Sequence, residues 1–366
     1  MTGQGLTDLG IEQAPRISVI VPVHNGGLQL SRCLDALRLS DYDSFEVIVV
    51  DDCSTDNSPQ IVERFGARYV RTPHKMGPGG ARNLGVEQAR GEIVVFVDAD
   101  VVVPSGALRR IAEQFEQDAD LAALFGSYDE SPAWNDFFSQ YKNLMHHYVH
   151  QISNERAVTF WAGCGAMRRE VFLQFGGFKA EKYPNPSIED IELGYRLSGA
   201  GMKILLDKQL QVKHLKKWTV RGLLRADILC RAVPWTHLIL ETKNLPRDLN
   251  LTYASQMSSL LVGLLVLLVA LLPLSALGLF DWIAPAALLG AAAVVIVILL
   301  LLNWRVYRWF AARRGWWFAA GAVVAHWAYY FYSGAVFGLL AGAHFLRSFL
   351  AAAMRGIGMG PARARE

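Results

Sequence analysis

The chain has few cysteines and almost no net charge, and both shortages narrow the classes of protein to which it can belong. Its 366 residues include four cysteines and carry a formal net charge of +3. None of the cysteines forms a CxxC pair or stands beside clustered histidines, so the sequence does not indicate a redox pair or a zinc site. A charge this small does not indicate a nucleic-acid partner. We expect free thiols at Cys33, Cys53, Cys164 and Cys230.

Two further signals are missing from the first part of the chain. Residues 1–16 are polar and lack the apolar core of a secretory signal peptide, so we expect a tail at 1–15 and a first domain that stays in the cytoplasm. The glycines of 77–82 (GPGGAR) are followed by neither the Lys-Ser/Thr of a phosphate loop nor the spacing of a dinucleotide fingerprint. We expect them to permit a tight turn before a helix that starts near Ala81.

Three apolar runs, at 17–25, 45–56 and 91–100, each end in polar residues. Continuous Val, Ile and Phe runs predict strands that are buried on both faces, as in a parallel α/β sheet covered by helices. Ligands of such sheets bind outside the carboxyl ends of the strands. The polar residues that fall there are Asn25, Asp51, Asp52, Asp98 and Asp100.

Asp98 and Asp100 are two residues apart and would face the same side of an extended chain. Two carboxylates placed in this way suit a hard divalent cation that bridges to phosphate oxygens. The alternative is a turn at the end of the strand that continues into Pro104.

Long uncharged runs are confined to the last third of the chain. Residues 258–280 and 282–302 contain no charged side chain and can each span roughly 30 Å of hydrocarbon. A third candidate, 316–346, is aromatic and contains His326 and His344, which suggests packing against partner helices. We therefore expect a transmembrane region at 251–346 with three spans.

Basic residues near the first two spans predict their orientation. Lys243 and Arg247 precede the first span and four arginines follow the second, so both flanks should be cytoplasmic. The two spans then form a hairpin with its outside loop near Asp281, in an integral protein of the plasma (inner) membrane. The four arginines are Arg305, Arg308, Arg313 and Arg314.

The basic C-terminal tail, 347–366, conflicts with a third crossing. A third span would place this tail outside, which the positive-inside rule disfavours. Either the rule fails here or 316–346 re-enters the membrane. The arginines concerned are Arg347, Arg355, Arg363 and Arg365.

A basic segment at 213–250 precedes the first span. Its first part, 213–235, interleaves Lys and Arg with Leu, Ile and Trp, which is typical of a helix at a membrane surface. The alternative is a solvated face of the soluble domain.

Several motifs occur together and in order: VPVHN, VVDDCSTD, GPGGARNLGVEQARGE, VDAD and EDIELGYRL. In this combination the chain resembles glycosyltransferase family 2, on the GT-A fold, over roughly residues 16–235. The resemblance implies a cytoplasmic GT-A domain, which we place at 16–212, followed by the α-helical transmembrane region. It also implies a nucleotide-diphosphate sugar as donor, with a UDP-sugar favoured.

The resemblance assigns roles to the residues at the strand ends. Four of them would hold the base and ribose, and Arg82 would approach the nucleotide or its phosphates. Asp98 and Asp100 match the DxD motif of the family, with Asp100 as ligand of Mn²⁺ or Mg²⁺ and Asp98 nearer the ribose or a metal-bound water. The four nucleotide-binding residues are Pro22, Asn25, Asp51 and Asp52. For Asp51 and Asp52 the alternative is a turn that caps a helix.

Two later residues extend this assignment. Asp190 matches the general base of the family, and Glu189 stands beside it. His214 matches a histidine that some metal-dependent relatives use as a further ligand. The alternatives are an ordinary helix cap at Ser187–Asp190 and an interfacial histidine.

A general base indicates a hydroxyl acceptor, because phosphate oxygens are already anionic at neutral pH. We therefore expect inverting transfer to a hydroxyl on a membrane lipid or lipid-linked saccharide, with a polyprenyl phosphate second. Processive polysaccharide synthases carry Q-x-x-R-W where this chain has Arg231 and Trp235, so a processive enzyme is a weaker alternative whose motif does not match. Arg231 and Trp235 could touch the acceptor, and Trp161 could stack on a sugar ring or belong to the core.

Two hypotheses from other classes remain. The chain could bind a sugar nucleotide without turning it over, as a scaffold in a membrane complex, although every expected carboxylate is retained. A nucleotidyltransferase would need a basic glycine-rich loop after the first strand, which VPVHNGG does not provide.

Overall fold

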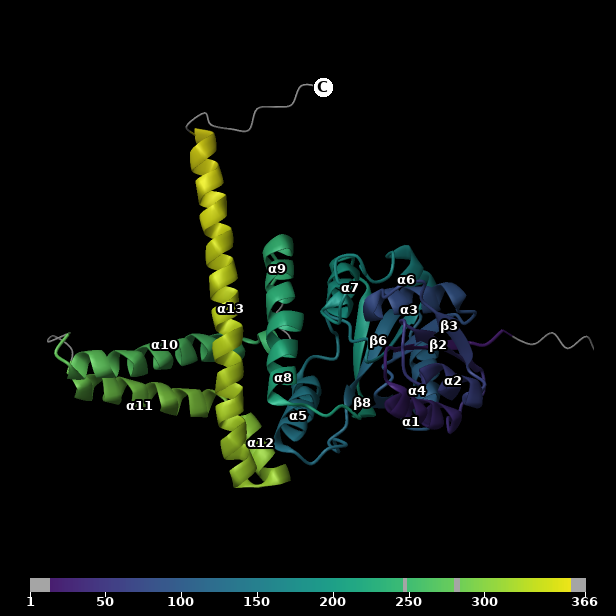
Figure 1. The fold of residues 1–366 in the computed structure, drawn as a ribbon, viewed down its shortest axis with the longest axis horizontal. Helices are drawn as coiled ribbons and strands as arrows, with labels where there is room; N and C mark the ends of the chain where they lie inside the picture. Colours follow the sequence, from purple (N-terminus) through teal and green to yellow (C-terminus); the bar gives the residue numbers. More distant parts are fainter. Residues whose placement is uncertain (1–13, 246–248, 280–283, 357–366) are drawn as a thin grey trace, which may run out of the picture. The chain divides into compact units, whose positions relative to one another are not determined.

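The computed structural model describes residues 14–245, 249–279 and 284–356, and they form two compact units (Figure 1). The first unit contains the described residues up to Ala133 together with Glu155–Lys216. The second contains Trp134–Asn154 and the described residues from Lys217 onward. Most of the expected N-terminal tail, Arg247, the loop near Asp281 and the last ten residues of the expected C-terminal tail lie outside the described residues.

An eight-stranded sheet with the order β3-β2-β1-β4-β7-β6-β8-β5 forms the centre of the first unit. β1 pairs in parallel with β2 and β4, whereas β7 runs antiparallel to β4 and β6. The predicted α/β sheet is confirmed, and the three apolar runs form the parallel neighbours β2, β1 and β4, but the sheet as a whole is mixed because β7 and β5 run antiparallel to their neighbours. The strands are β1 Ile17–Val23, β2 Phe45–Asp51, β3 Arg68–Arg71, β4 Ile93–Val97, β5 Val101–Val102, β6 Leu121–Tyr128, β7 Cys164–Arg168 and β8 Lys203–His214.

Helices cover both faces of this sheet because its central strands are apolar on both sides. Val19 and Val21 of β1 face one hydrophobic core, and Ile20 of the same strand faces a second. Helices α1, α2 and α4 contribute to the first core, and α3, α6 and α7 to the second. Their bounds are α1 Gly27–Arg38, α2 Ser58–Phe65, α3 Gly77–Gln88, α4 Ala107–Gln117, α6 Arg169–Gln174 and α7 Glu189–Gly199.

Helix α3 begins at Gly77, which corrects the expected start near Ala81. The reason is a distant carboxylate: Asp52, after β2, accepts hydrogen bonds from the backbone N–H groups of Met76 at 2.7 Å and Gly77 at 2.9 Å. Free N–H groups at a helix start need such partners. Gly77 itself has φ +73° and passes so close to the carbonyl of Pro184 that a side chain would clash there.

The second unit is helical. It includes α5, which lies within the range expected for the α/β domain but packs its Tyr141 and Leu144 against Phe310. The chain therefore leaves the sheet after β6 and returns before β7. The bounds are α5 Phe137–Ile152, α8 Val220–Asp227, a π-helical turn Ile228–Ala232, α9 Val233–Thr242, a 3₁₀ turn Leu249–Leu251, α10 Tyr253–Ala276, α11 Pro285–Leu302, α12 Trp304–Arg314 and α13 Trp316–Gly356.

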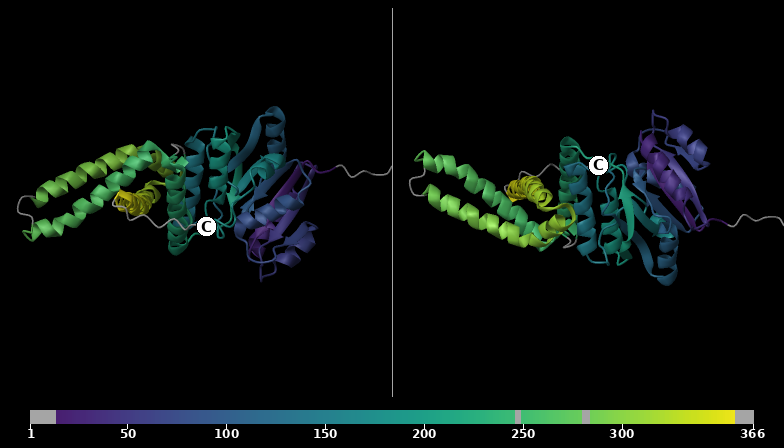
Figure 2. Two further views of the ribbon diagram at one scale, coloured as in Figure 1. Left: turned by 90° about the horizontal axis from the view of Figure 1, so that it is seen from above. Right: turned by 90° about the horizontal axis from the view of Figure 1, so that it is seen from below.

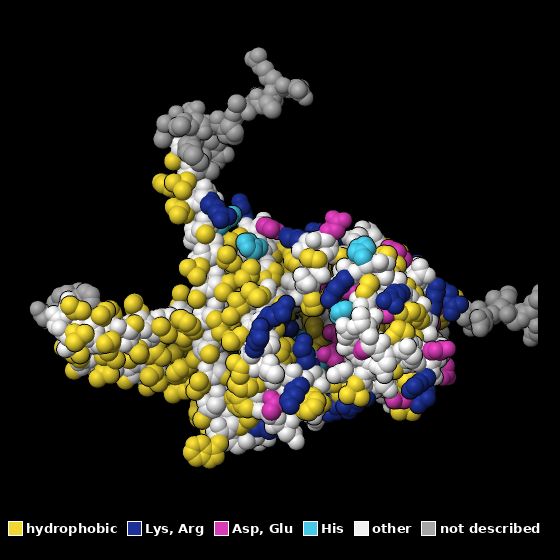
Figure 3. Space-filling model, viewed as in Figure 1, with side chains coloured by type: hydrophobic (Ala, Val, Ile, Leu, Met, Phe, Trp, Pro, Cys, Tyr) yellow, Lys and Arg dark blue, Asp and Glu magenta, His cyan; other side chains and the backbone are white. Residues whose placement is uncertain are grey.

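Within the part of this unit that the structure describes, three helices are long and apolar enough to cross a membrane: Tyr253–Ala276, Pro285–Leu302 and Trp316–Leu350. They overlap the predicted spans at 258–280, 282–302 and 316–346. The first helix starts earlier than predicted because Thr252 caps it by accepting a hydrogen bond from the N–H of Ser255. Hydrophobic side chains cover the surface of α10 and α11 in the space-filling view (Figure 3).

The packing of α7 on the sheet predicts different effects for two glycines of this helix. A Cβ at Gly194 would clash with the backbone of Thr159 and Phe160, whereas a Cβ at Gly199 would meet nothing within 4 Å. We expect Gly194→Ala to lower the stability of the first unit by about 1–3 kcal/mol, as overpacking does, and Gly199→Ala to leave it nearly unchanged. Thermal unfolding in detergent, followed by tryptophan fluorescence, measures both. Equal melting temperatures for the two variants would contradict the described packing.

Candidate active site

The carboxyl ends of β1, β2 and β4 lie at one edge of the sheet, because the three strands are parallel neighbours. Pro22 is half-buried in β1 opposite Val50, and Asn25 follows this strand. Asp98 and Asp100 follow β4. The predicted gathering of these polar residues at one edge is therefore present in the fold.

Asp51 and Asn25 hold the loops at this edge together. The buried carboxylate of Asp51 accepts hydrogen bonds from the N–H of Ser54 at 2.7 Å and the hydroxyl of Tyr69 at 2.6 Å. The side-chain oxygen of Asn25 accepts one from the N–H of Thr55 at 2.8 Å. The alternative for Asp51 and Asp52 was a turn that caps a helix. Asp51 does accept hydrogen bonds that order the turn after β2, and Asp52 accepts those from the start of α3.

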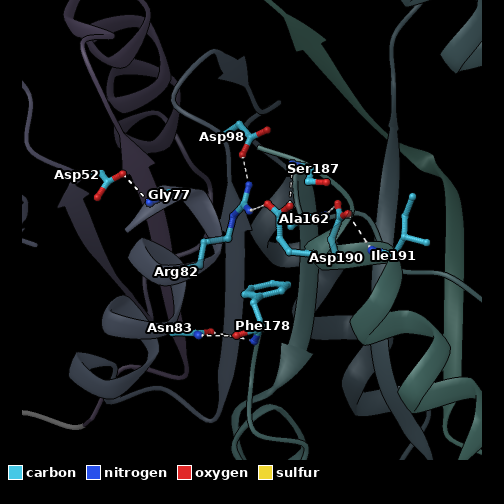
Figure 4. A network of polar contacts seen from close by, with 11 residues as sticks. Asp52, Gly77, Arg82, Asn83, Asp98, Ala162, Phe178, Ser187, Asp190 and Ile191 are labelled. Atoms are coloured by element: carbon cyan, nitrogen blue, oxygen red, sulfur yellow. Dashed lines mark hydrogen bonds and ion pairs between the residues drawn. The ribbon is translucent and has the colours of Figure 1, made fainter. Parts of the chain in front are cut away.

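Arg82 on α3 forms the centre of the site (Figure 4). One terminal nitrogen donates to Asp98 Oδ1 at 2.6 Å, and the other donates to Glu189 Oε1 at 3.0 Å. Its guanidinium carbon lies 5.7 Å from the centre of the Phe178 ring. The side chains of Arg82 and Glu189 are 6% and 5% exposed, so this is a buried ion pair. Arg82 thus connects the end of β4 to the start of α7.

Asn83, the next residue, fixes the ring beneath Arg82. Its side chain donates to the carbonyl of Phe178 at 2.8 Å and accepts from the N–H of Phe178 at 2.9 Å. Neither Asn83 nor Phe178 was among the predicted site residues. The sequence feature that could have indicated them is the presence of both an Ala-Arg-Asn and a Gly-Gly-Phe segment, but the two segments are far apart along the chain.

Glu189 and Asp190 are neighbours at the start of α7 with different environments. The second oxygen of Glu189 accepts from the N–H of Ser187 at 3.0 Å, so both of its oxygens have partners. Burial, and after it the charge of Asp190, raise the pKa of Glu189 above its usual range. Asp190 is only half-buried, and its oxygens accept from the N–H groups of Ala162 at 3.0 Å and Ile191 at 2.8 Å. Asp190 is the more accessible of the two carboxylates.

The expected alternative of a helix cap by Ser187 and Asp190 is not what the structure shows. Ile188 occupies the cap position of α7, and no side chain caps it. The helix ends at Gly199, and Gly201 follows in the left-handed conformation at φ +80°.

Asp100 directly precedes β5 and lies beside His214, the last residue of β8, with which β5 pairs. His214 Nε2 is 3.5 Å from Asp100 Oδ2, and its ring stacks on Tyr128 with centres 4.3 Å apart. Burial raises the pKa of Asp100, but the hydrogen bond from His214 and the charges of His214 and Lys216 outweigh it, and the net shift is downward. Asp100 is therefore held ionised.

A carboxylate beside an imidazole is a donor set that Mn²⁺ accepts readily, and Mg²⁺ through the oxygens. Asp98 lies two residues away, although Arg82 engages one of its oxygens. Among the residues that the structure describes, no three His, Cys, Asp or Glu side chains converge as a complete metal cage. The residues present fit a cation that is bound partly by the phosphates of a ligand.

Three other predicted residues lie around or away from this constellation. Trp161 is half-buried, and its ring lies edge-on to that of Tyr128 with the ring centres 4.9 Å apart. Its indole also covers Gly163, where a side chain would clash with it. Arg231 and Trp235 belong to the second unit, in the π-helical turn and α9.

Residues 18–176 match the family model described as Glycosyl transferase family 2. The chain is 38% identical over 122 residues to glycosyltransferase GlyG of Streptococcus pneumoniae, an alignment that covers 31% of this chain and 40% of that protein. It is 32% identical over 119 residues to the GalNAc(5)-diNAcBac-PP-undecaprenol beta-1,3-glucosyltransferase of Campylobacter jejuni, covering 31% of this chain and 38% of that protein. The chain thus spans less than half the length of these curated relatives.

One solved structure shares the fold over most of the chain. The mannosyltransferase PcManGT from Pyrobaculum calidifontis, solved in complex with GDP-Man and Mn²⁺, matches 86% of this chain and 86% of its own with a TM-score of 0.51 and 19% sequence identity. At this identity the likeness concerns the fold.

The contacts of Arg82 predict a large cost for its removal. In Arg82→Met, Asp98 and Glu189 lose their shared cation while Glu189 stays buried, and we expect a loss of about 3–5 kcal/mol of stability. As a control, Arg38→Met removes an exposed pair with Asp35 and should cost less than about 1 kcal/mol. Chemical unfolding of both variants in detergent measures the difference. A loss in Arg82→Met as small as that in Arg38→Met would show that the pair is not buried as described.

Proposed function

We propose that the chain, whose residues 18–176 match the model of glycosyltransferase family 2, transfers a sugar from a nucleotide-diphosphate sugar to a hydroxyl group of a membrane lipid or a lipid-linked saccharide. The favoured donor is a UDP-sugar. The name of the Campylobacter jejuni relative, a glucosyltransferase of an undecaprenol-linked saccharide, supports an acceptor of this class. The three candidate spans support an acceptor held in the membrane.

The observation that carries this proposal is the pairing of Asp98 and Glu189 through Arg82. Asp98 lies at the strand end where a nucleotide would bind, and Glu189 directly precedes Asp190. Arg82 therefore fixes the distance between the donor side of the site and the candidate base. Reactions of two substrates gain most from groups held in this way.

In the proposed reaction Asp190 is the general base. The proton of the acceptor hydroxyl moves to a carboxylate oxygen of Asp190 while the acceptor oxygen forms a bond to the anomeric carbon. The bond between that carbon and the diphosphate oxygen breaks, and its electron pair leaves with the nucleoside diphosphate. Attack from the opposite side inverts the configuration. The N–H groups of Ala162 and Ile191 donate hydrogen bonds to the carboxylate of Asp190 and hold it in place.

The remaining residues position the donor. We propose that Pro22, Asn25, Asp51 and Asp52 shape the pocket for the base and ribose through the loops that they order, and that Asp98 contacts the ribose or diphosphate. Asp100, with His214 beside it, would hold Mn²⁺ or Mg²⁺. The cation supplies positive charge that stabilises the departing diphosphate. Tyr128, stacked on His214, keeps the imidazole oriented toward Asp100.

We also propose that the first unit faces the cytoplasm. Lys243 precedes α10, and Arg305 and Arg308 follow α11. Basic flanks remain on the cytoplasmic side. Nucleotide sugars would then reach the site from the compartment in which this unit lies.

The direct test follows nucleoside-diphosphate release by the purified protein in detergent with Mn²⁺ or Mg²⁺. A panel of UDP-, GDP- and dTDP-sugars is supplied with and without membrane lipid extract. We expect release from one donor that rises with lipid. Release that depends on added polyprenyl phosphate instead would identify the second acceptor class. Donor binding without turnover under every lipid condition would favour the non-catalytic scaffold.

The role of Asp190 predicts the effect of its neutral analogue. Asp190→Asn cannot accept the proton, so we expect turnover to fall by about 10²–10⁴-fold while donor affinity, measured by calorimetry, changes little. Asp120→Asn, on an exposed turn before β6, is the matched control and should turn over normally. Retained turnover in Asp190→Asn would remove Asp190 from the proposed mechanism.

The cation site predicts a metal dependence that two residues control. A chelator should abolish turnover, and added Mn²⁺ should restore it. We expect Asp100→Asn and His214→Ala to weaken Mn²⁺ binding by about tenfold or more, measured by electron paramagnetic resonance with the donor present. Unchanged Mn²⁺ affinity in both variants, with Asp120→Asn as reference, would place the cation elsewhere or show that none is used.

A further inference from the structure

Helix α13 runs across the α10–α11 hairpin instead of lying along it. The hairpin and α13 point in clearly different directions in Figure 1, and α13 appears nearly end-on in the view from above in Figure 2 while the hairpin remains extended. All three helices belong to the second unit. Helices that cross one bilayer together lie within moderate tilts of its normal. The hairpin and α13 therefore do not suit the same role.

The contacts that the structure describes between α13 and the hairpin lie toward the end of the hairpin that adjoins α12. Tyr330 donates a hydrogen bond to Asn303 Oδ1 at 3.0 Å, and Asn303 donates to Ser258 at 2.9 Å. Gly334 passes close to Ser259. Ser258 and Ser259 lie near the start of α10, and Asn303 follows the end of α11.

The apolar contacts point to the same place. Tyr330 packs with Val262, Val295 and Leu299, together with Trp327. The α13 residues in these contacts thus span about two helical turns of a helix that is 41 residues long. A third helix packed lengthwise in a bundle would form a seam over many turns.

The same stretch of α13 contacts a buried ion pair. Tyr332 donates to Asp227 Oδ2 at 2.7 Å, and Lys142 of α5 donates to the other oxygen of Asp227. Asp227 ends α8, whose Arg221 and Arg225 are exposed. Tyr332 lies at the middle of the candidate span Trp316–Leu350. If α13 crossed the bilayer, these charges would lie at the centre of the hydrocarbon, where charged groups are costly.

We propose that α13 does not cross the bilayer but lies in the plane of its cytoplasmic face, so that the chain crosses twice and its C-terminus stays on the side of the first unit. The exposed surface of α13 then contacts lipid at the boundary between headgroups and acyl chains. Leu339 is 76% and Phe349 70% exposed, which makes the second half of α13 a large uncovered apolar surface. Its length, about 60 Å, is twice the thickness of the hydrocarbon.

The two ends of α13 fit this placement. Trp316 and Trp317 at its start are exposed, and tryptophan prefers the membrane interface. Arg313 and Arg314 precede them, and Arg347 lies near the other end. Basic residues at both ends suit the anionic surface of a cytoplasmic leaflet. The conflict between a third crossing and the basic tail then disappears.

The first test compares the sides on which the two termini lie. An epitope tag is placed before Met1, after Leu279 or after Glu366 of the full chain, and antibody access is measured in intact and in permeabilised spheroplasts. We expect both terminal tags to require permeabilisation and the tag after Leu279 to be accessible in intact cells. Terminal tags on opposite sides would overturn the proposal, and so would three tags on one side. The result does not depend on turnover, so it stands apart from the proposed reaction.

A second measurement distinguishes a helix in the plane from one that slants through the bilayer. Nitroxide labels are attached at Ala335→Cys and Phe349→Cys, which share one face of α13, in a chain whose half-buried Cys53 and Cys230 are serines. After reconstitution, accessibility to oxygen and to a polar nickel reagent gives the depth of each label. We expect equal depths. A crossing helix would separate the two labels by about 20 Å along the normal, which would overturn the proposal.

Discussion

The site depends on the guanidinium of Arg82, which two carboxylates from different parts of the fold share. Asp98, Glu189 and Asp190 come close together at the edge of the sheet, and like charges in a poorly hydrated region repel. Arg82 supplies the compensating charge in a rigid planar group whose two terminal nitrogens donate to different acids, whereas a lysine would offer one compact charge without this fixed geometry. Because the guanidinium is fixed by Phe178 below and by a carboxylate on each side, the start of α7 keeps its position relative to the end of β4.

The start of helix α3 determines the position of Arg82. The carboxylate of Asp52, after β2, accepts hydrogen bonds from the first turn of this helix. Because Gly77 has no side chain, the backbone at Pro184 can lie directly against this turn. A Cβ at Gly79 would meet Glu189 and Phe178 at 3.4 Å, which is ordinary van der Waals contact, so these two residues pack directly over this glycine. The glycines of this segment therefore permit close approach of two loops, a role different from binding phosphate through a glycine-rich turn.

The sequence predicted the parts of this protein that local pattern determines. Apolar runs defined β1, β2 and β4, and their ends predicted that Asn25, Asp98 and Asp100 would meet at one edge. Local pattern did not reveal the start of α3, because Asp52 reaches it from 25 residues away. The partner of Glu189 was missed for the same reason, since Arg82 lies 107 residues before it. Hydropathy identified α13 as apolar but contains no information on the direction of a helix, which depends on its partners Asn303 and Asp227.

The excursion of the chain through α5 has a consequence for how such proteins can be recombined. The first unit is built from two stretches, up to Ala133 and Glu155–Lys216, and the helix between them packs its Tyr141 and Leu144 in the second unit. A single crossover after Lys216, joining this unit to the membrane helices of another protein, would carry α5 along without the residues that cover its apolar face. A chimera that exchanges the first unit between relatives must therefore take α5 and the helices after Lys216 from the same parent, although they are separate stretches of the chain. A mismatched chimera would expose that face and aggregate before any question of activity arose.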